Sequence, residues 1–170
     1  MTTLITGGSK CGKSRLAEKL LDNCENKIYI ATMRPFGEEA VAAIERHRKI
    51  RAGKSFMTIE KYTEIHEINL PENSAVLLEC MANLCANEMF RNDEICDPTE
   101  QIIRGIRHLQ SGAEMLVIVT NNVGSDGIDY GEGTNRYIEI MGKVNALVSA
   151  ISDNVVECVY GVPVILKGRL

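Results

Sequence analysis

A glycine-rich segment near the start of the chain combines the residue types that bind phosphate. Residues 7–14 read Gly-Gly-Ser-Lys-Cys-Gly-Lys-Ser, which matches G-x-x-x-x-G-K-[ST] at every fixed position. Glycines let the backbone turn tightly, so that successive N–H groups point into one concavity and bind phosphate oxygens. The spacing places Lys13 at the β- and γ-phosphates of a nucleoside triphosphate and the Ser14 hydroxyl at Mg²⁺. The segment therefore predicts a triphosphate site that uses Mg²⁺.

A carboxylate is expected to complete this site. Sites of this type take an acidic side chain from the end of a neighbouring strand to hold Mg²⁺, directly or through water. Glu79 ends the apolar run 74–79 (SAVLLE), where an unpaired charge would be costly to bury. We therefore expect Glu79 to share the metal with Ser14. The alternative is a strand-end glutamate that is only solvated.

A histidine lies within a cluster of cations further along the chain. Residues 45–51 read Glu-Arg-His-Arg-Lys-Ile-Arg, so four cations surround His47. A neutral imidazole can attack phosphorus, and nearby Arg and Lys side chains lower its pKa and neutralise phosphate charge. His47 also continues the line of Ala43 and Ile44 on a helical pattern, so a packing role is the alternative. His66 and His108 have no such neighbours, and we treat them as incidental.

The elements that would position these residues alternate between strand-like and helix-like patterns. Strands are predicted at residues 2–6, 27–32, 74–79 and 114–120, with two more within 155–167 around Gly161. Helices are predicted at residues 13–21, 38–51, about 99–110 and 134–152. Asp97-Pro98-Thr99-Glu100 supplies a cap, a first-turn proline and an N3 glutamate for the third helix.

This alternation predicts an α/β fold. Near-continuous apolar strands separated by amphipathic helices indicate a mostly parallel sheet with helices on both faces. The last two strands are expected to form an antiparallel hairpin at one edge. Ligands of such sheets bind outside the carboxyl ends of the strands, which points to the segments after Thr6, Ala31, Glu79 and Thr120.

Composition limits the class of protein. With 170 residues, 45% hydrophobic and 25% charged, the chain suits a single domain over residues 1–170. The net charge of −4 gives no reason to expect a nucleic-acid binder. No apolar run approaches the roughly 18 residues of a membrane span, and the amino terminus does not resemble a secretory signal. We expect a cytoplasmic protein with six reduced cysteines and no thiol-bound metal.

Taken together, the motifs resemble one family, the bifunctional adenosylcobinamide kinase/adenosylcobinamide-phosphate guanylyltransferases of cobalamin biosynthesis. The likeness spans nearly the whole chain. It is carried by residues 4–14, 29–32 (YIAT), 44–48 (IERHR), 77–80 (LLEC), 119–121 (VTN), 123–124, 142–145 (GKVN) and 161–167 (GVPVILK). The resemblance implies a RecA-like P-loop fold of three layers that assembles as a homotrimer.

The resemblance also implies two reactions and a set of site residues. ATP or GTP phosphorylates the aminopropanol hydroxyl of adenosylcobinamide. GTP then donates GMP through the family's nucleophile, which falls on His47, to adenosylcobinamide phosphate, and the product is adenosyl-GDP-cobinamide. The family's nucleotide contacts fall on Gly7, Gly8, Ser9, Lys10, Cys11, Gly12, Lys13, Ser14, Ala31, Thr32, Met33, Arg48, Lys49, Ile50, Arg51, Glu60 and Glu79.

One departure from the family pattern concerns a carboxylate. The family usually reads Thr-Asn-Glu-Val-Gly where this chain has Asn122 as the third residue. A group that could bind Mg²⁺ or accept a substrate proton is therefore missing. Asp126, Asp129 and Glu132 in the following loop are candidates to replace it.

Two other functions remain open at this point. One is a P-loop kinase that acts on another small molecule, in which His47 would be structural. The other is a nucleotide-binding regulatory subunit that acts through a partner. Incubation with α-labelled and γ-labelled GTP separates these readings: a guanylyltransferase retains the α label covalently, a simple kinase retains neither label, and a regulatory subunit only binds the nucleotide.

Overall fold

The computed structural model describes residues 1–51, 53–91 and 95–170, apart from the side chains of Glu39, Ala40, Ala43, His47, Ile50 and Arg51. Within these residues, seven strands form one sheet in the order β3-β2-β4-β5-β1-β6-β7. The strands are β1 (Thr2–Thr6), β2 (Asn26–Ala31), β3 (Phe56–Glu60), β4 (Ser74–Glu79), β5 (Ala113–Val119), β6 (Asn154–Val159) and β7 (Val162–Lys167). All neighbouring pairs are parallel except β6 and β7, which form the predicted antiparallel hairpin.

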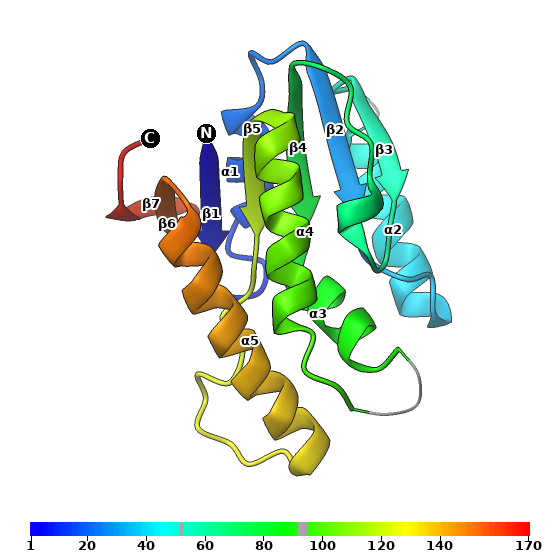
Figure 1. The fold of residues 1–170 in the computed structure, drawn as a ribbon, viewed down its shortest axis with the longest axis vertical. Coiled ribbons are helices and arrows are strands. Elements are labelled where there is room, and N and C mark those ends of the chain that lie inside the picture. Colours follow the sequence, from blue (N-terminus) through cyan, green and yellow to red (C-terminus); the bar gives the residue numbers. More distant parts are fainter. Residues whose placement is uncertain (52, 92–94) are drawn as a thin grey trace.

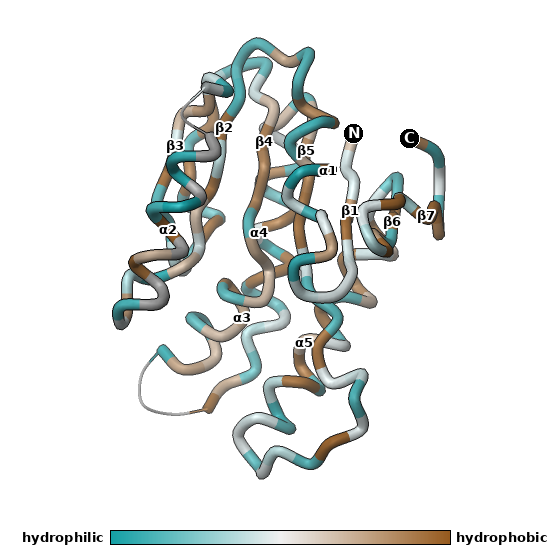
Figure 2. Tube along the Cα trace, turned by 180° about the vertical axis from the view of Figure 1, so that it is seen from behind, coloured by the Kyte–Doolittle hydropathy of each residue, from teal (hydrophilic) through white to brown (hydrophobic). Residues whose placement is uncertain are grey.

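Helices cover both faces of this sheet, as the sequence predicts. They are α1 (Lys13–Leu20), α2 (Gly37–Arg51), α3 (Met81–Met89), α4 (Thr99–Gly112) and α5 (Glu132–Ile151), with a short 3₁₀ helix η1 (Ile65–Glu67). Figure 1 shows α4 and α5 crossing in front of the strands, with α1 behind them. Seen from behind, α1 lies over the centre of the sheet and α2 lies at the β3 edge (Figure 2). The molecule is therefore a three-layer α/β fold of the P-loop type.

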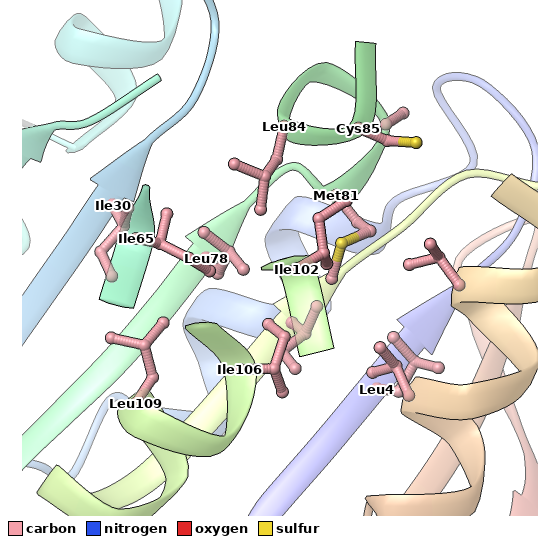
Figure 3. Packing of buried hydrophobic residues seen from close by; sticks show 14 of the residues in the cluster. Leu4, Ile30, Ile65, Leu78, Met81, Leu84, Cys85, Ile102, Ile106 and Leu109 are labelled. Carbon is pink, nitrogen blue, oxygen red and sulfur yellow. The ribbon is translucent and has the colours of Figure 1, made fainter. Parts of the chain in front are cut away.

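Buried side chains fill the space between the layers. On the α1 side, Ala17 and Leu21 pack against Leu77 and Val117 of the sheet. The opposite face holds a larger cluster, in which strand residues such as Leu78 meet apolar residues of η1, α3, α4 and α5. Figure 3 shows the α3 residues above Leu78, with the α4 residues packed beside it. This packing fixes the start of α3, just beyond the carboxyl end of β4.

Three elements were not predicted from the sequence: β3, η1 and α3. Strand β3 lies at an edge of the sheet, and most of its side chains are at least partly exposed, so it lacks the apolar run that marks a central strand. Helix α3 has nine residues and begins one residue after β4 ends, which leaves no loop to separate the two patterns. The other predicted strands and helices are confirmed, with ends that shift by one or two residues.

Two details change the predicted picture. Strand β5 lies between β4 and β1, so the strand that carries Glu79 is not the direct neighbour of the strand before the phosphate loop. Helix α4 begins at Thr99 with Pro98 at its N-cap, so Pro98 and Glu100 each lie one position earlier in the helix than predicted. The Asp97 carboxylate accepts a hydrogen bond from the Thr99 backbone N–H at 3.0 Å, just ahead of the helix. None of the helices within the described ranges is both long enough and apolar enough to cross a membrane.

Candidate active site

The loop between β1 and α1 has the tight backbone that phosphate binding requires. Gly7 has φ 142° and Gly12 has φ 103°, values that residues with a side chain rarely adopt. A Cβ on Gly7 would lie 2.5 Å from the backbone oxygen of Cys158 in β6. The turn between β6 and β7 also supports the loop, because the Gly161 N–H donates to the Cys11 carbonyl at 2.8 Å. Glycine is therefore required here both by conformation and by close packing.

Lys13 is held across this loop. Its side chain is only 7% exposed, and its ammonium donates to the backbone oxygens of Gly7 at 3.0 Å and Gly8 at 2.6 Å. A phosphate oxygen carries more negative charge than a carbonyl oxygen and makes a stronger partner for an ammonium. The contacts therefore keep the positive charge of Lys13 at the concave side of the loop, where a triphosphate can compete for it.

Ser14 and Glu79 meet at the start of α1, although β4, which ends at Glu79, is not the neighbour of β1, which precedes the loop. The Ser14 hydroxyl donates a hydrogen bond to Oε1 of Glu79. The Tyr29 hydroxyl, which comes from β2, donates to Oε2 of the same carboxylate at 3.1 Å. Mg²⁺ prefers oxygen ligands such as hydroxyl and carboxylate groups, and water and phosphate oxygens complete its coordination shell. The arrangement fits that ion and also positions the glutamate between two hydroxyl groups.

Two cavities open on the phosphate loop. The first, which we call the flank cavity, has a volume of about 500 Å³ and is lined by Lys10, Cys11, Gly12, Lys13, Ser14, Arg15, Glu18, Arg46, Lys54 and Glu79. The second, the sheet cavity, has a volume of about 350 Å³ and is lined by Ser9, Lys10, Lys13, Ser14, Tyr29, Ala31, Met33, Ile44, Arg46, Arg48, Thr58, Glu60, Glu79, Cys80, Asn83, Val119 and Asn121. Lys10, Lys13, Ser14, Arg46 and Glu79 line both cavities, so they mark the place where the two meet.

Most of the predicted nucleotide contacts outside the loop gather in the sheet cavity. Ala31, Met33, Arg48 and Glu60 line it together with Glu79. Arg48 forms an ion pair with Glu60 and so joins α2 to β3. The hydrogen bond from Arg48 lowers the pKa of Glu60, with a smaller effect from Tyr62. Glu60 is therefore ionised at neutral pH, and both partners remain largely exposed.

Thr32 has a different environment from the one that the family pattern implies. It is completely buried. Its hydroxyl donates to the Cys80 carbonyl and accepts from the Cys80 N–H, both at 2.8 Å, and its carbonyl accepts from the Asn87 side chain at 2.7 Å. These bonds fasten the end of β2 to the segment after β4. In this conformation Thr32 connects β2 to the segment after β4, and its side chain is not accessible to a ligand.

Helix α2 carries the remaining predicted residues. Lys49 is exposed. The backbones of His47, Ile50 and Arg51 lie in α2, but their side chains are outside the described part of the structure. The predicted roles of these four residues stay predictions. Figure 1 places α2 beside β3, next to the carboxyl end of β2.

The candidate replacements for the missing carboxylate belong to a separate loop. Oxygens of the Asp126 carboxylate accept hydrogen bonds from the Tyr130 hydroxyl and the Ile128 N–H. Asp129 accepts from the Gly131 N–H at 3.0 Å and from the Asn135 side chain. Neither aspartate lines the flank cavity or the sheet cavity, and Glu132 begins α5 (Figure 1). Asp126 and Asp129 therefore stabilise their own loop, and the structure gives no support to a replacement of the missing carboxylate by any of the three residues.

Several residues that line the site have weak or no signals in the sequence. Arg46, one of the four cations around His47, lines both cavities, although the family pattern assigns it no nucleotide contact. Tyr29 lies in the predicted strand 27–32 and in the motif 29–32 (YIAT), but neither pattern indicates a role for its hydroxyl. Glu18 and Lys54 form an ion pair at the flank cavity, yet they are 36 residues apart, and no spacing rule connects them.

Comparison with known proteins adds independent information. A sequence profile of the family described as cobinamide kinase / cobinamide phosphate guanyltransferase matches residues 3–166. The bifunctional adenosylcobalamin biosynthesis protein CobU of Escherichia coli strain K12 is 31% identical over 182 residues, covering 98% of this chain and 100% of that protein. The CobU protein of Salmonella typhimurium strain LT2 is 29% identical over 184 residues, with coverage of 98% and 100%.

A solved structure supports the fold alone. A protein from Pyrococcus horikoshii OT3 superimposes with a TM-score of 0.50 at 13% identity, covering 99% of this chain and 87% of that chain. The sequence match, by contrast, extends over almost every element described above, from β1 to β7. The chain belongs to the cobinamide kinase / cobinamide phosphate guanyltransferase family.

Proposed function

We propose that this chain catalyses two successive reactions at its phosphate loop. In the first, the hydroxyl of adenosylcobinamide attacks the γ-phosphate of ATP or GTP, and the diphosphate leaves. In the second, GMP passes from GTP to adenosylcobinamide phosphate by way of His47, and pyrophosphate leaves. The product is adenosyl-GDP-cobinamide. Family membership supports both reactions, and the route through His47 is the finer part of the proposal.

One observation carries this proposal: the phosphate loop and the cationic helix α2 line the same cavities. Lys13 and Ser14 of the loop meet Arg46 of α2 around Glu79. A triphosphate bound there would be in contact with cations from two separate elements. Because transfer of a phosphoryl or nucleotidyl group depends mainly on positioning and on neutralising charge, this is the machinery that both reactions need.

In the first reaction the chain binds and orients the donor. The loop N–H groups and Lys13 would hold the terminal phosphates, and Arg46 would approach them from α2. Ser14 and Glu79 would hold Mg²⁺, which when bound neutralises charge on the phosphate oxygens. The acceptor hydroxyl would reach the γ-phosphate through the sheet cavity, which is lined there by the ends of β4 and β5 and by Asn121.

In the second reaction His47 would act as the nucleophile. A ring nitrogen of the neutral imidazole attacks the α-phosphorus, a P–N bond forms, and the bond to the pyrophosphate oxygen breaks. A phosphate oxygen of adenosylcobinamide phosphate then attacks the same phosphorus and releases His47. The flanking cations Arg46 and Arg48 disfavour protonation of the imidazole and so keep it in the form that can attack.

The proposal extends to the assembly of the chain. Strand β7 is at the edge of the sheet, and it exposes four apolar side chains to solvent: Val162, Val164, Ile165 and Leu166. An exposed apolar edge strand is a site of association or aggregation in solution, which natural proteins usually cover. We propose that this strand contributes to a homotrimer, that residues 1–170 act as one unit, and that the enzyme works in the cytoplasm. Light scattering of Leu166→Glu should show dissociation; an unchanged trimer would place the interface elsewhere.

Intact-mass measurement tests the histidine route directly. After treatment with GTP and Mg²⁺, the wild-type chain should gain one GMP, and peptide mapping should place it on His47. The His47→Ala variant should gain none, while His66→Ala and His108→Ala serve as matched controls and should label normally. GTP labelled at the α-phosphate should leave its label on the protein, and GTP labelled at the γ-phosphate should not. An adduct on another residue, or none with an active enzyme, would remove His47 from the mechanism.

A further inference from the structure

We propose that the flank cavity is a separate nucleoside subsite, which binds the purine of the triphosphate that donates its γ-phosphate in the kinase step. This inference rests on the proposed kinase function. It concerns Arg15, Glu18 and Lys54, which line the flank cavity and not the sheet cavity. No role in nucleotide binding follows for these residues from the phosphate-loop motif.

The direction of the triphosphate along the loop places its nucleoside in this cavity. The sheet cavity includes the ends of β4 and β5, represented by Cys80, Val119 and Asn121. The flank cavity instead includes the second half of the loop and the first turns of α1, represented by Cys11 and Arg15. A γ-phosphate that faces an acceptor at the strand ends therefore leaves the α-phosphate and the nucleoside beside α1.

The wall of the flank cavity offers the groups that recognise a purine. Glu18 follows Ser14 by one helical turn and is 5% exposed. Its Oε2 is paired with the Lys54 ammonium, and among the residues that the structure describes Oε1 has no hydrogen-bond donor. A buried carboxylate oxygen without a donor is costly. The exocyclic amino group of adenine or guanine supplies such a donor, and Lys54 lies where it can donate to a purine ring acceptor.

The other walls suit the flat faces of a base. Arg15 is exposed at the mouth of the cavity, and a guanidinium stacks readily on an aromatic ring. Gly12 has no side chain, and the volume of about 500 Å³ is within the range of small-molecule sites. The cavity also carries Lys10, Lys13 and Arg46 where it meets the sheet cavity, so a phosphate chain can enter from the shared region.

Two subsites explain how one phosphate loop can serve two reactions. Attack on the γ-phosphate and attack on the α-phosphate require the nucleophile at opposite ends of the triphosphate. Of the nucleotide contacts implied by family resemblance outside the loop, Ala31, Met33, Arg48 and Glu60 line the sheet cavity alone. We assign the guanylyl group to that cavity and the kinase donor to the flank cavity, with the phosphates bound in the shared region in both cases.

Equilibrium binding of ATP and of inorganic triphosphate separates the nucleoside from the phosphates. In Arg15→Ala and in Glu18→Gln, the Kd for ATP should rise about tenfold, while the Kd for inorganic triphosphate should stay within about twofold of wild type. The Lys19→Ala variant, which removes an exposed cation from the same helix, should leave both constants unchanged. The rate of GMP-adduct formation at limiting GTP should change less than about twofold in all three variants.

Three results would overturn the inference, and a fourth would refute the proposed function on which it rests. Equal weakening of ATP and inorganic triphosphate would show that Arg15 and Glu18 act on phosphates, which overturns the inference. Unchanged ATP binding in both variants overturns it too, as does a rise confined to the KM for adenosylcobinamide, because the cavity would then serve the acceptor. Both variants should fold, because Glu18→Gln keeps the shape of the side chain and Arg15 is on the surface. A melting curve of each variant checks this. Wild-type protein that binds neither triphosphate would instead refute the proposed function itself.

Discussion

Replacing Glu79 by glutamine is the most informative perturbation of this site. The substitution keeps the size of the side chain and removes its charge. We expect the turnover number to fall about a hundredfold and the half-saturating Mg²⁺ concentration to rise about tenfold. Binding of a triphosphate without metal should not weaken, because the lost charge has the same sign as the phosphates.

The magnitude follows from the two hydroxyl groups on this carboxylate. Ser14 donates to one oxygen and Tyr29 to the other. A hydrogen bond to a charged group contributes about 1.5–3 kcal/mol and one between neutral groups about 0.5–1.5 kcal/mol, so neutralising Glu79 costs roughly 2 kcal/mol over both bonds. Loss of attraction for a dication adds about 1 kcal/mol or more, and a total near 3 kcal/mol corresponds to about a hundredfold in rate.

Magnesium titrations of turnover provide the assay, with binding of the free nucleotide measured in chelator. Tyr29→Phe is the graded control, because it removes one hydrogen bond to the carboxylate and keeps the charge; the lower end of the range for a charged partner, about 1.5 kcal/mol, predicts a fall of about tenfold. Glu67→Gln, a change at an exposed glutamate that pairs with Lys61, should have no effect. An unchanged Mg²⁺ requirement in Glu79→Gln would refute the reasoning and move the metal away from Ser14 and Glu79.

Three further perturbations test separate parts of the structure. Lys13→Ala should reduce turnover at saturating GTP by about a hundredfold or more while the melting temperature changes little; turnover close to wild type would exclude the phosphate-loop role. Gly7→Ala should destabilise the fold by about 2 kcal/mol in urea unfolding, because alanine would adopt φ 142° with its Cβ 2.5 Å from the Cys158 oxygen; a wild-type midpoint would contradict this packing. Hydrogen bonds from Thr99, with Lys143 as a further partner, lower the pKa of Asp97 from 3.8 to about 2, so Asp97→Asn should cost about 1–2 kcal/mol at pH 7 after allowance for the 31% exposure of this side chain. Because the pKa of Asp97 is lower in the folded than in the unfolded chain, its ionised carboxylate stabilises the fold at pH values above the unfolded-state pKa. The difference in unfolding free energy between wild type and Asp97→Asn should therefore disappear as the pH falls from about 4 to 2. A difference that is the same at pH 7 and at about pH 2 would exclude the ionised carboxylate as its source.

The phosphate loop could be predicted because its chemistry is local. Eight consecutive residues contain the glycines, Lys13 and Ser14, and the strand and helix on either side are marked by their own apolar patterns. Glu79 could also be predicted, although by an argument that was only partly correct. It ends a buried strand, as expected, but β5 separates that strand from β1. The side chain reaches Ser14 across the ends of the strands, since all carboxyl ends of the parallel strands meet at one edge.

What the sequence could not supply are contacts between distant segments. Thr32 was expected to face a nucleotide, but its partners are Cys80 and Asn87, which are remote in the sequence. Glu18 pairs with Lys54 because the tertiary fold brings the segment after α2 next to α1. No local sequence pattern predicts that contact. Edge strand β3 escaped prediction for a related reason, because its exposed side chains carry little of the apolar signal that identifies a central strand.

The last strands of the chain have a direct bearing on the first loop. Gly7 packs against the Cys158 carbonyl, and the Cys11 carbonyl accepts hydrogen bonds from the Gly161 N–H and the Cys158 thiol. The phosphate loop is therefore shaped by the β6–β7 hairpin as well as by its own glycines. The same hairpin presents the apolar edge of β7 to solvent. In the homotrimer proposed above, a partner covering that edge would contact the same hairpin that supports the phosphate loop, so assembly would be expected to restrain the loop backbone.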